Sequence, residues 1–284
     1  MVEGPWTRWF LRVATALVLA FVYFPLVIIT LYAFNANTTQ SWPIQDWTTR
    51  WFSVAFHDED VRDAFFLSIK AAILATAVAL VLGTLLALAM ARFSFFGRNA
   101  LTFLVVLPIA LPGIITGIAL NATITTILQP IGITFGLATI VIGHATFCIV
   151  LAYNNVVARL RQTSRSFEEA SADLGADSWT TFRRVIVPSM GTALLAGGLL
   201  AFGLSFDEVI VTVFTSGAEQ TLPIWIFTNL ARPQQLPVIN VVAFVIVLIS
   251  ILPVYAAQRL AGGTGLTSER PVRGTVAASV EVEP

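Results

Sequence analysis

Two adjacent carboxylates, Asp207 and Glu208, interrupt an apolar stretch that reads LSFDEVIVTVF over residues 204–214. An ionised side chain in hydrocarbon costs roughly 2.5–3.5 kcal/mol on insertion scales, so such groups face protein or water rather than lipid. Neighbouring side chains on a helix point about 100° apart, so both acids face one direction only if the helix breaks there. The stretch therefore predicts a helix break at the two acids, and a functional or structural site within an apolar element.

Composition indicates that the elements around these acids lie in a membrane. The chain has 284 residues, of which 57% are hydrophobic and 11% charged, and its mean hydropathy is +0.83. Such values are typical of a protein that crosses the membrane several times. The formal net charge is zero, so no overall basic field favours nucleic acid. The single cysteine, Cys148, cannot form an internal disulfide, and we expect it to be a small buried residue.

Charge-free apolar runs predict an all-α membrane protein with six transmembrane helices, because about 20 apolar residues span a bilayer core and long continuous runs exclude barrel strands. The first run is longer than the apolar core of a signal peptide. The expected spans are 13–34, 64–91, 100–128, 135–158, 192 into the stretch 204–214, and 237–258. Around this membrane domain, 13–260, we expect a cytoplasmic N-terminus, 1–12, a cytoplasmic loop, 159–190, and a disordered cytoplasmic tail, 261–284.

Arginines in the loops predict the orientation, because cytoplasmic loops carry an excess of Lys and Arg. With the N-terminus inside, twelve arginines fall in inner segments, and only Arg50, Arg62 and Arg232 fall outside. Both termini are therefore expected to be cytoplasmic. Asp207 would then lie about 22 Å from the inner start of its span, in the outer half of a ~30 Å core. The tryptophans of the outer segment 35–63 suit an interfacial belt or a short surface helix.

The third span contains LPIALPGIITGIAL, in which Pro108 and Pro112 each remove a backbone donor and predict a kink. Gly113 and Gly117 form a G-x-x-x-G pair, which permits close approach of another helix. The pattern fits a bent helix that lines a cavity, and it fits simple helix packing equally well.

The cytoplasmic segment 159–189 predicts two short helices joined by a sharp turn. Ser166 and Glu169 have capping-box spacing, and Gly175 is a helix stop signal. Asp177 or Ser178 can cap a second helix, which Pro188 would end. The segment is either an ordinary amphipathic loop or a docking site for a soluble partner.

Within this segment a family motif is visible: Glu169-Ala170-Ser171, then Gly175, then Val185, Val187 and Pro188. It resembles the E-A-A, Gly, I-x-L-P motif of the permease subunits of binding-protein-dependent ABC importers, with serine in the third position and valines in place of isoleucine and leucine. The resemblance implies a type I ABC importer permease fold. It also implies that Glu169 contacts a separate ATPase and that Gly175 forms the elbow of a coupling helix.

This chain itself lacks the G-x-x-x-x-G-K-[ST] loop that holds ATP phosphates, and its only lysine, Lys70, lies in LSIKAA. We therefore expect no catalytic residue, bound cofactor or metal in this chain. The resemblance places ATP and Mg on a partner ATPase dimer. It further implies a second homologous permease, an extracytoplasmic solute-binding protein, the lipid bilayer as surroundings and a location in the bacterial inner membrane.

The stretches AYNNVVARLR, EEASADLGADSWTTFRRVIVPS, LLAFGLSFDEVIVTVFTSG and TLPIWIF are similar to the spermidine/putrescine branch of these permeases, to its C-type subunit. The resemblance implies polyamine transport. Polyamines are long cations, so a pathway would need carboxylates together with aromatic rings. The candidate pathway residues are Asp207, Glu208, Tyr153, Asn154, Phe206 and Trp225.

Other interpretations stay open from the sequence. One acid can instead bind backbone amides at a helix break, or pair with an arginine of the partner permease. The permease could carry another small solute. An ion-coupled secondary carrier that uses Asp207 and Glu208 is a further alternative, although a carrier has no use for an ATPase dock. His57 and His144 stand alone in the sequence, and we expect ordinary structural roles for both.

Overall fold

The computed structural model describes residues 4–262, and within this range the regular secondary structure is entirely helical. The N-terminal half contains α1 (Pro5–Ala33), α2 (Arg50–His57), α3 (Glu59–Arg92), α4 (Arg98–Ala110), α5 (Gly113–Thr123), a π-helical turn (Ile124–Leu128) and a 3-10 turn (Gln129–Ile131). The C-terminal half contains α6 (Leu137–Gln162), α7 (Ser166–Asp173), α8 (Ser178–Thr181), a π-helical turn (Phe182–Ile186), α9 (Val187–Ser189), α10 (Gly191–Phe206), α11 (Ile210–Thr215), α12 (Leu222–Asn229), a 3-10 turn (Pro233–Gln235) and α13 (Leu236–Gly262).

Five helices of the described chain are long and apolar enough to cross a membrane. A sixth crossing results when the bent pair Ser178–Ser189 and Gly191–Phe206, whose axes meet at 66°, is taken as one span. The structure therefore agrees with the predicted all-α membrane fold. The expected first span, 13–34, is the later part of α1, and the fourth and sixth spans end within a few residues of α6 and α13.

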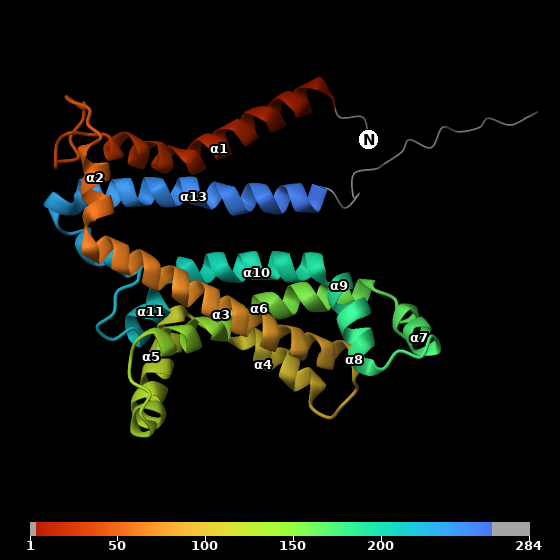
Figure 1. The fold of residues 1–284 in the computed structure, drawn as a ribbon. Helices are drawn as coiled ribbons and strands as arrows, with labels where there is room; N and C mark the ends of the chain where they lie inside the picture. Colours follow the sequence, from red (N-terminus) through yellow and green to blue (C-terminus); the bar gives the residue numbers. More distant parts are fainter. Residues whose placement is uncertain (1–3, 263–284) are drawn as a thin grey trace, which may run out of the picture.

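The helices form two groups (Figure 1). One group is α1 packed beside α13, and the other is the bundle of α3, α6 and α10 with the shorter α4, α5 and α11 around it. The loop that carries α7 and α8 lies at one end, and α2 lies at the opposite end. The start of α1 and the end of α13 lie at the same end as α7. This arrangement is compatible with the expected cytoplasmic termini, whose side of the membrane stays a prediction.

Small residues allow the central helices to approach closely, as is typical of membrane helix interfaces. A buried stripe along α3 includes Ala72, Ala75, Ala79 and Gly83. A Cβ atom added at Gly83 would lie 2.8 Å from the Cβ atom of Ala152 in α6. Packing of α3 against α6 and α10 thus forms the centre of the bundle, and the two acids follow directly after the end of α10.

The prediction for the third span is wrong in its continuity. Instead of one bent helix over 100–128, the chain forms α4 and α5 with a break at Leu111 and Pro112. Leu111 is extended (φ −82°, ψ 143°), as the residue before a proline prefers, whereas Pro108 is tolerated inside α4. Gly113 and Gly117 face α11, and a Cβ atom at Gly117 would lie 2.4 Å from the ring of Phe214. The glycine pair therefore serves helix packing.

The opposite end of the molecule contains the expected short surface helix, α2 (Figure 1). Phe34 at the end of α1 packs against Phe52 of α2 and Phe244 of α13, with ring centroids 5.1 and 5.7 Å away. In contrast, most large side chains of α1 are exposed, Phe21 to 82%. The predicted segment 1–12 falls partly, and the predicted tail 261–284 almost entirely, outside the described residues.

Candidate functional site

The expected break in the fifth span is present. Helix α10 ends at Phe206 and α11 begins at Ile210, so Asp207 and Glu208 lie on non-helical backbone between two helices. The amide of Asp207 still donates to the carbonyl of Gly203 at 3.2 Å and closes α10. The C-terminal end of α10, with its partial negative charge, therefore meets the partially positive N-terminal end of α11 at the two carboxylates.

The two acids have different surroundings. Glu208 accepts a hydrogen bond from the amide of Val211 at 2.9 Å through its Oε1 atom, and so it satisfies a free donor in the first turn of α11. Asp207 is exposed, and its carboxylate makes no hydrogen bond or ion pair to any other residue that the structure describes. The structural interpretation of the acids therefore holds for Glu208, and Asp207 is left available to a ligand.

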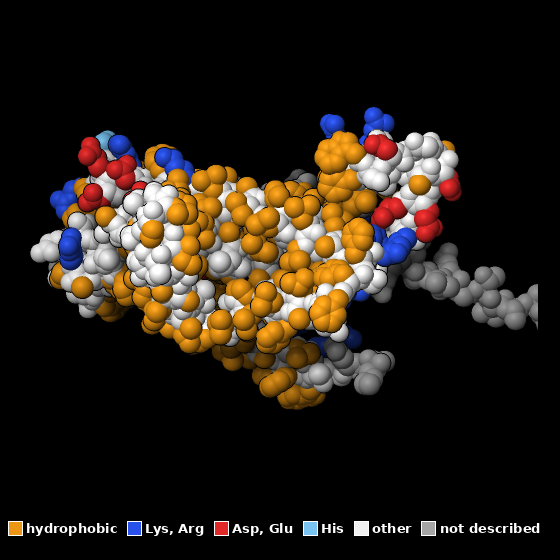
Figure 2. Space-filling view, turned by 90° about the horizontal axis from the view of Figure 1, so that it is seen from below, with side chains coloured by type: hydrophobic (Ala, Val, Ile, Leu, Met, Phe, Trp, Pro, Cys, Tyr) orange, Lys and Arg blue, Asp and Glu red, His pale blue; other side chains and the backbone are white. Residues whose placement is uncertain are grey.

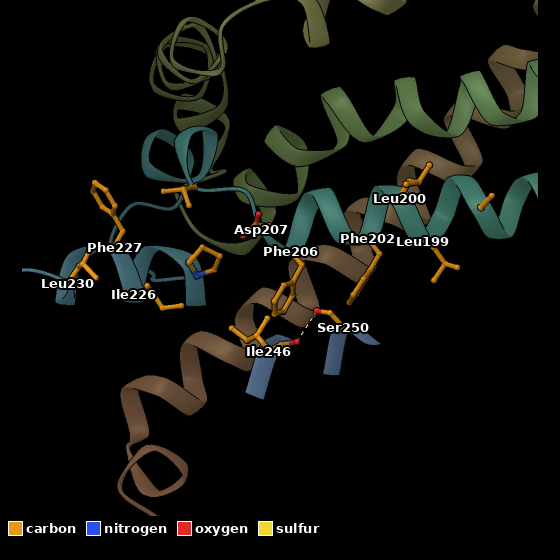
Figure 3. Close-up of a pocket in the computed structure, with 14 residues that line it drawn as sticks. Leu199, Leu200, Phe202, Phe206, Asp207, Ile226, Phe227, Leu230, Ile246 and Ser250 are labelled. Carbon is orange, nitrogen blue, oxygen red and sulfur yellow. Dashed lines mark hydrogen bonds between the residues drawn. The ribbon is translucent and has the colours of Figure 1, made fainter. Parts of the chain in front are cut away.

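Asp207 lies at the edge of a cavity of about 930 Å³ (Figure 3). Phe202 and Phe206 line it from α10, with ring centroids 6.0 Å apart. Side chains of α12, of Leu230 directly after it and of α13 form the other walls: Pro223, Ile226, Phe227, Leu230, Ile246 and Ser250. The lining is apolar except for Asp207 and Ser250, whose hydroxyl donates to the carbonyl of Ile246 at 2.8 Å. One carboxylate above apolar and aromatic walls suits an elongated organic cation.

The structure brings only two of the six candidate pathway residues to this cavity, Phe206 and Asp207. Tyr153 is buried in a core cluster with Met90 and Met190, away from the cavity. Asn154 is exposed elsewhere on α6, and Trp225 is buried in the cluster of α1, α2, α3 and α13 residues. Sequence reasoning could name aromatic and amide residues in neighbouring spans, but only the packing decides which way they point.

A buried residue that sequence reasoning left aside also belongs to the break. His144 of α6 is 1% exposed, and its two ring nitrogens each lie 2.7 Å from a hydroxyl: Nδ1 from Ser205 and Nε2 from Thr212. These hydroxyls belong to α10 and α11, on either side of the break. His144 is more than sixty positions away from both partners in the sequence, and its neighbouring residues give no indication of this role. His57, by contrast, lies near the carbonyl of Ser53 in α2. Among the described residues, no group of three or more His, Cys, Asp or Glu could hold a metal ion.

The second candidate site is the loop with α7 and α8, at the end of the molecule away from α2 (Figure 1). Gly175 has a left-handed conformation (φ +82°), and its amide donates to the carbonyl of Ala172 at 2.8 Å. The amide of Ala176 donates to the carbonyl of Ser171 at 3.1 Å, which completes a Schellman motif. The expected helix stop and sharp turn at Gly175 are thus confirmed.

The predicted start of α7 is wrong in detail. The residue before the helix is Arg165, without a side-chain cap, and the amide of Ser166 is instead bound by Ser164 Oγ at 3.2 Å. Glu169 makes no capping-box bond and is exposed. Asp177 does cap α8, since its carboxylate accepts from the amide of Thr180 at 3.1 Å. Hydrogen bonding from the side chain and then from the amide of Thr180 lowers the pKa of Asp177 below its usual value.

Polar contacts attach this loop to the membrane bundle. Glu168 forms an ion pair with Arg92 at the end of α3, and Arg165 donates to the carbonyl of Ala91 at 3.3 Å. Ser171 and Thr181 are hydrogen bonded at 3.0 Å and join α7 to α8. The loop is therefore a positioned element rather than a free connection.

The outer face of the loop carries apolar side chains in the open. Leu174 is 89% exposed, Trp179 66% and Phe167 62%, and Glu169, Ala170 and Pro188 are exposed as well. Figure 2 shows acidic, basic and apolar side chains gathered on this projecting loop, beyond the apolar belt of the bundle. Exposed large apolar groups rimmed by charges are typical of protein interaction sites.

Comparison with known proteins identifies the class. Residues 79–262 match the family described as "Binding-protein-dependent transport system inner membrane component", and the chain belongs to this family. It is accordingly a multi-pass inner-membrane component of an ABC transport system. Within the family it falls in the spermidine/putrescine branch, as two of its curated relatives show.

The chain is 33% identical over 252 residues to the putrescine transport system permease protein PotI of Escherichia coli (strain K12), covering 87% of each protein. It is 30% identical over 255 residues to the spermidine/putrescine transport system permease protein PotC of Haemophilus influenzae, covering 89% of this chain and 96% of that one.

Solved structures show the same fold at low sequence identity. A chain of a bacterial ABC transporter involved in the import of the acidic polysaccharide alginate has a TM-score of 0.66 at 17% identity, covering 93% of this chain and 99% of that chain. A chain of the MetNI methionine ABC transporter has a TM-score of 0.55 at 16% identity, covering 71% of this chain and 93% of that chain.

Proposed function

We propose that this chain is a permease subunit of an ATP-driven importer and forms half of the translocation pathway for polyamine-like cations such as putrescine and spermidine. The observation that carries the proposal is the cavity with Asp207 at its edge, in a chain related to putrescine and spermidine permeases.

The chemistry of the cavity supports a cation. The negative end of the α10 dipole and the free carboxylate of Asp207 both favour positive charge. Phe202, Phe206 and Phe227 offer aromatic faces to ammonium and methylene groups. The cavity is open on one side in the isolated chain, and we infer that a second, homologous permease closes it.

The cytoplasmic loop supports a separate energy source. Glu169, Ala170, Ser171, Gly175 and Pro188 lie in or beside the projecting turn, whose exposed apolar groups would enter a cleft of an ATPase subunit. We infer that an ATPase dimer binds ATP and Mg. An extracytoplasmic solute-binding protein would deliver the substrate. A solved relative, the alginate transporter, is seen in complex with a substrate-bound periplasmic protein.

Uptake of radiolabelled putrescine and spermidine by cells that carry the complete transport system tests the proposal. We expect uptake to disappear when the cognate ATPase is deleted, and unlabelled diamines and triamines to compete. Uptake that survives the deletion would indicate an ion-coupled carrier. Competition by 4-aminobutyrate but not by polyamines would indicate a permease for another small solute.

A further inference from the structure

We propose that His144 is a positioning residue that fixes the direction of Asp207 by holding together the two halves of the broken fifth span. This inference rests on the proposed function, in which Asp207 faces the transported cation. His144 lies on α6, outside the broken span, and contacts Ser205 on one side of the break and Thr212 on the other.

The hydrogen bonds around His144 determine where its proton lies. The hydroxyl of Thr212 donates to the carbonyl of Glu208 at 2.7 Å, so its oxygen must accept from the histidine. Nε2 of His144 therefore carries the proton, and Nδ1 accepts from the hydroxyl of Ser205. The result is a directed series of hydrogen bonds, from Ser205 to His144 to Thr212 to the Glu208 carbonyl, in which each donor has an acceptor.

This series of hydrogen bonds begins and ends on either side of Asp207 in the sequence. Its first member lies two residues before Asp207, and its last acceptor is the backbone of the residue directly after it. The Asp207 carboxylate makes no hydrogen bond or ion pair to any side chain that the structure describes, so the place of this side chain depends on the position of its backbone. The side chain of Glu208, bound to the Val211 amide, fixes the same segment from the other end.

Two other hydrogen bonds hold the far end of α11 to neighbouring helices. Thr139 donates to the carbonyl of Thr215 at 2.7 Å, and Asn121 donates to the carbonyl of Phe214 at 2.8 Å. In the described part of the chain, His144 is the residue whose side chain bonds to both α10 and α11. Without it, α11 would keep its hydrogen bonds to α5 and α6 and the apolar packing of Val211 in a cluster with Ala201 of α10, but the hydrogen-bonded link from α10 to α11 through His144 would be lost.

The substitution Thr212→Val in the complete importer tests the proposal, because it removes the hydroxyl while keeping the shape. Thr215→Val is the matched control: this buried hydroxyl on the same helix bonds only to the carbonyl of Val211. We expect Thr212→Val to raise the KM for putrescine uptake about tenfold, since small misplacements of a positioned group have effects of this order or more. The control should leave the KM unchanged at an equal thermal stability of the complex.

Non-additivity separates positioning from a merely structural role. If His144 acts through Asp207, Thr212→Val should change nothing further in an Asp207→Asn background. Equal effects of Thr212→Val with and without the Asp207 carboxylate would overturn the inference, and so would a normal KM for Thr212→Val. If Thr212→Val reduces assembly of the complex, Ser205→Ala removes the hydrogen bond at the other end of the series and is compared in the same way.

A measurement without substrate separates this inference from the proposed function. In a Cys148→Ala background, Asp207→Cys is labelled with a charged thiol reagent, with and without Thr212→Val. We expect the labelling rate to change with Thr212→Val and not with Thr215→Val, whatever the importer carries. An unchanged rate overturns the role of His144, whereas a changed rate in an importer that does not take up polyamines overturns only the proposed substrate.

Discussion

Two of the pairs of adjacent carboxylates in this molecule can be compared: Glu168–Glu169 on the loop with α7 and α8, and Asp207–Glu208 in the broken fifth span. In each pair one acid is bound internally: Glu168 to Arg92, and Glu208 to the amide of Val211. The other acid of each pair, Glu169 or Asp207, is exposed and has no side-chain partner among the described residues.

This comparison shows how the fold can present a charged group at a defined place. The bound acid fixes the local backbone, and the neighbouring acid is then held with its own carboxylate free. The two sites differ in how the turn itself is made: the loop depends on the left-handed conformation of Gly175, whereas the break depends on contacts from α5 and α6. Each difference can be tested by substitution.

The largest effect is expected for Gly117→Ala, at the close contact between α5 and α11. A Cβ atom at Gly117 would lie 2.4 Å from the Phe214 ring, so overpacking should destabilise the complex by up to about 3 kcal/mol. Gly113→Ala is the matched control, because its Cβ atom would lie 3.6 Å from Ile210, in ordinary contact. Thermal unfolding of the purified complex measures both. Equal melting temperatures would show that the close approach to α11 does not support the break.

Gly175→Val should follow in size, and it acts on conformation rather than on space. No atom lies within 4 Å of a Cβ atom at Gly175, but a left-handed φ costs most L-residues about 1–2 kcal/mol. We expect membrane insertion to persist and ATP-driven uptake to fall about tenfold.

The control for Gly175→Val is Gly175→Asn, because asparagine tolerates the left-handed region. It should retain most of the uptake. Similar losses in the two variants would argue that side-chain size in the docking cleft matters, and not the turn.

A smaller effect is expected for Glu168→Gln, which removes the ion pair with the partly buried Arg92. The pair joins α7 to α3, so its loss should speed amide hydrogen exchange in α7, by a change of about 1 kcal/mol or less. Glu169→Gln should leave this exchange unaltered and reduce uptake instead. If the two substitutions exchange these phenotypes, the assignment of bound and free acid on the loop is wrong.

The smallest effect concerns Asp177, the cap of α8. Because its pKa is lowered in the folded chain by the bonds from Thr180, its contribution is present at pH values above the usual aspartate pKa and is lost as the pH falls through the folded value. Between pH 6 and 8 the protection of the Thr180 amide should therefore not vary with pH. Asp177→Ala should lower that protection, and Asp173→Ala should not. Equal protection in both variants would contradict the cap.

The sequence predicted the larger features because they follow from local physics. Apolar runs predicted the spans, the adjacent acids predicted the break at Asp207, and Gly175 predicted the turn. The prediction of a capping box at Ser166 was wrong because the amide of Ser166, which the Glu169 side chain would bind in such a box, donates instead to Ser164 Oγ. The prediction of a continuous third span was wrong because Pro112 favours an extended conformation at Leu111, which ends α4. Pro108, in contrast, lies inside α4 without ending it.

The composition of the cavity could not be predicted, because it depends on which faces of distant helices meet. Tyr153 and Trp225 are suitable residue types, but helix rotation buries both in core clusters. Phe202 and Phe227 line the cavity without any local signal that distinguishes them from other apolar residues. His144 joins the break through partners more than sixty positions away, at Ser205 and Thr212.

The measurement that tests the central claim most directly is polyamine uptake by the complete importer with Asp207→Asn, beside Glu208→Gln as its matched partner. Glutamine keeps an oxygen that can accept from the Val211 amide, so Glu208→Gln should transport nearly as the unchanged protein does. Asp207→Asn removes the free charge at the cavity and should reduce uptake about tenfold or more at equal assembly. Normal uptake with Asp207→Asn, or a greater loss with Glu208→Gln, would contradict the account.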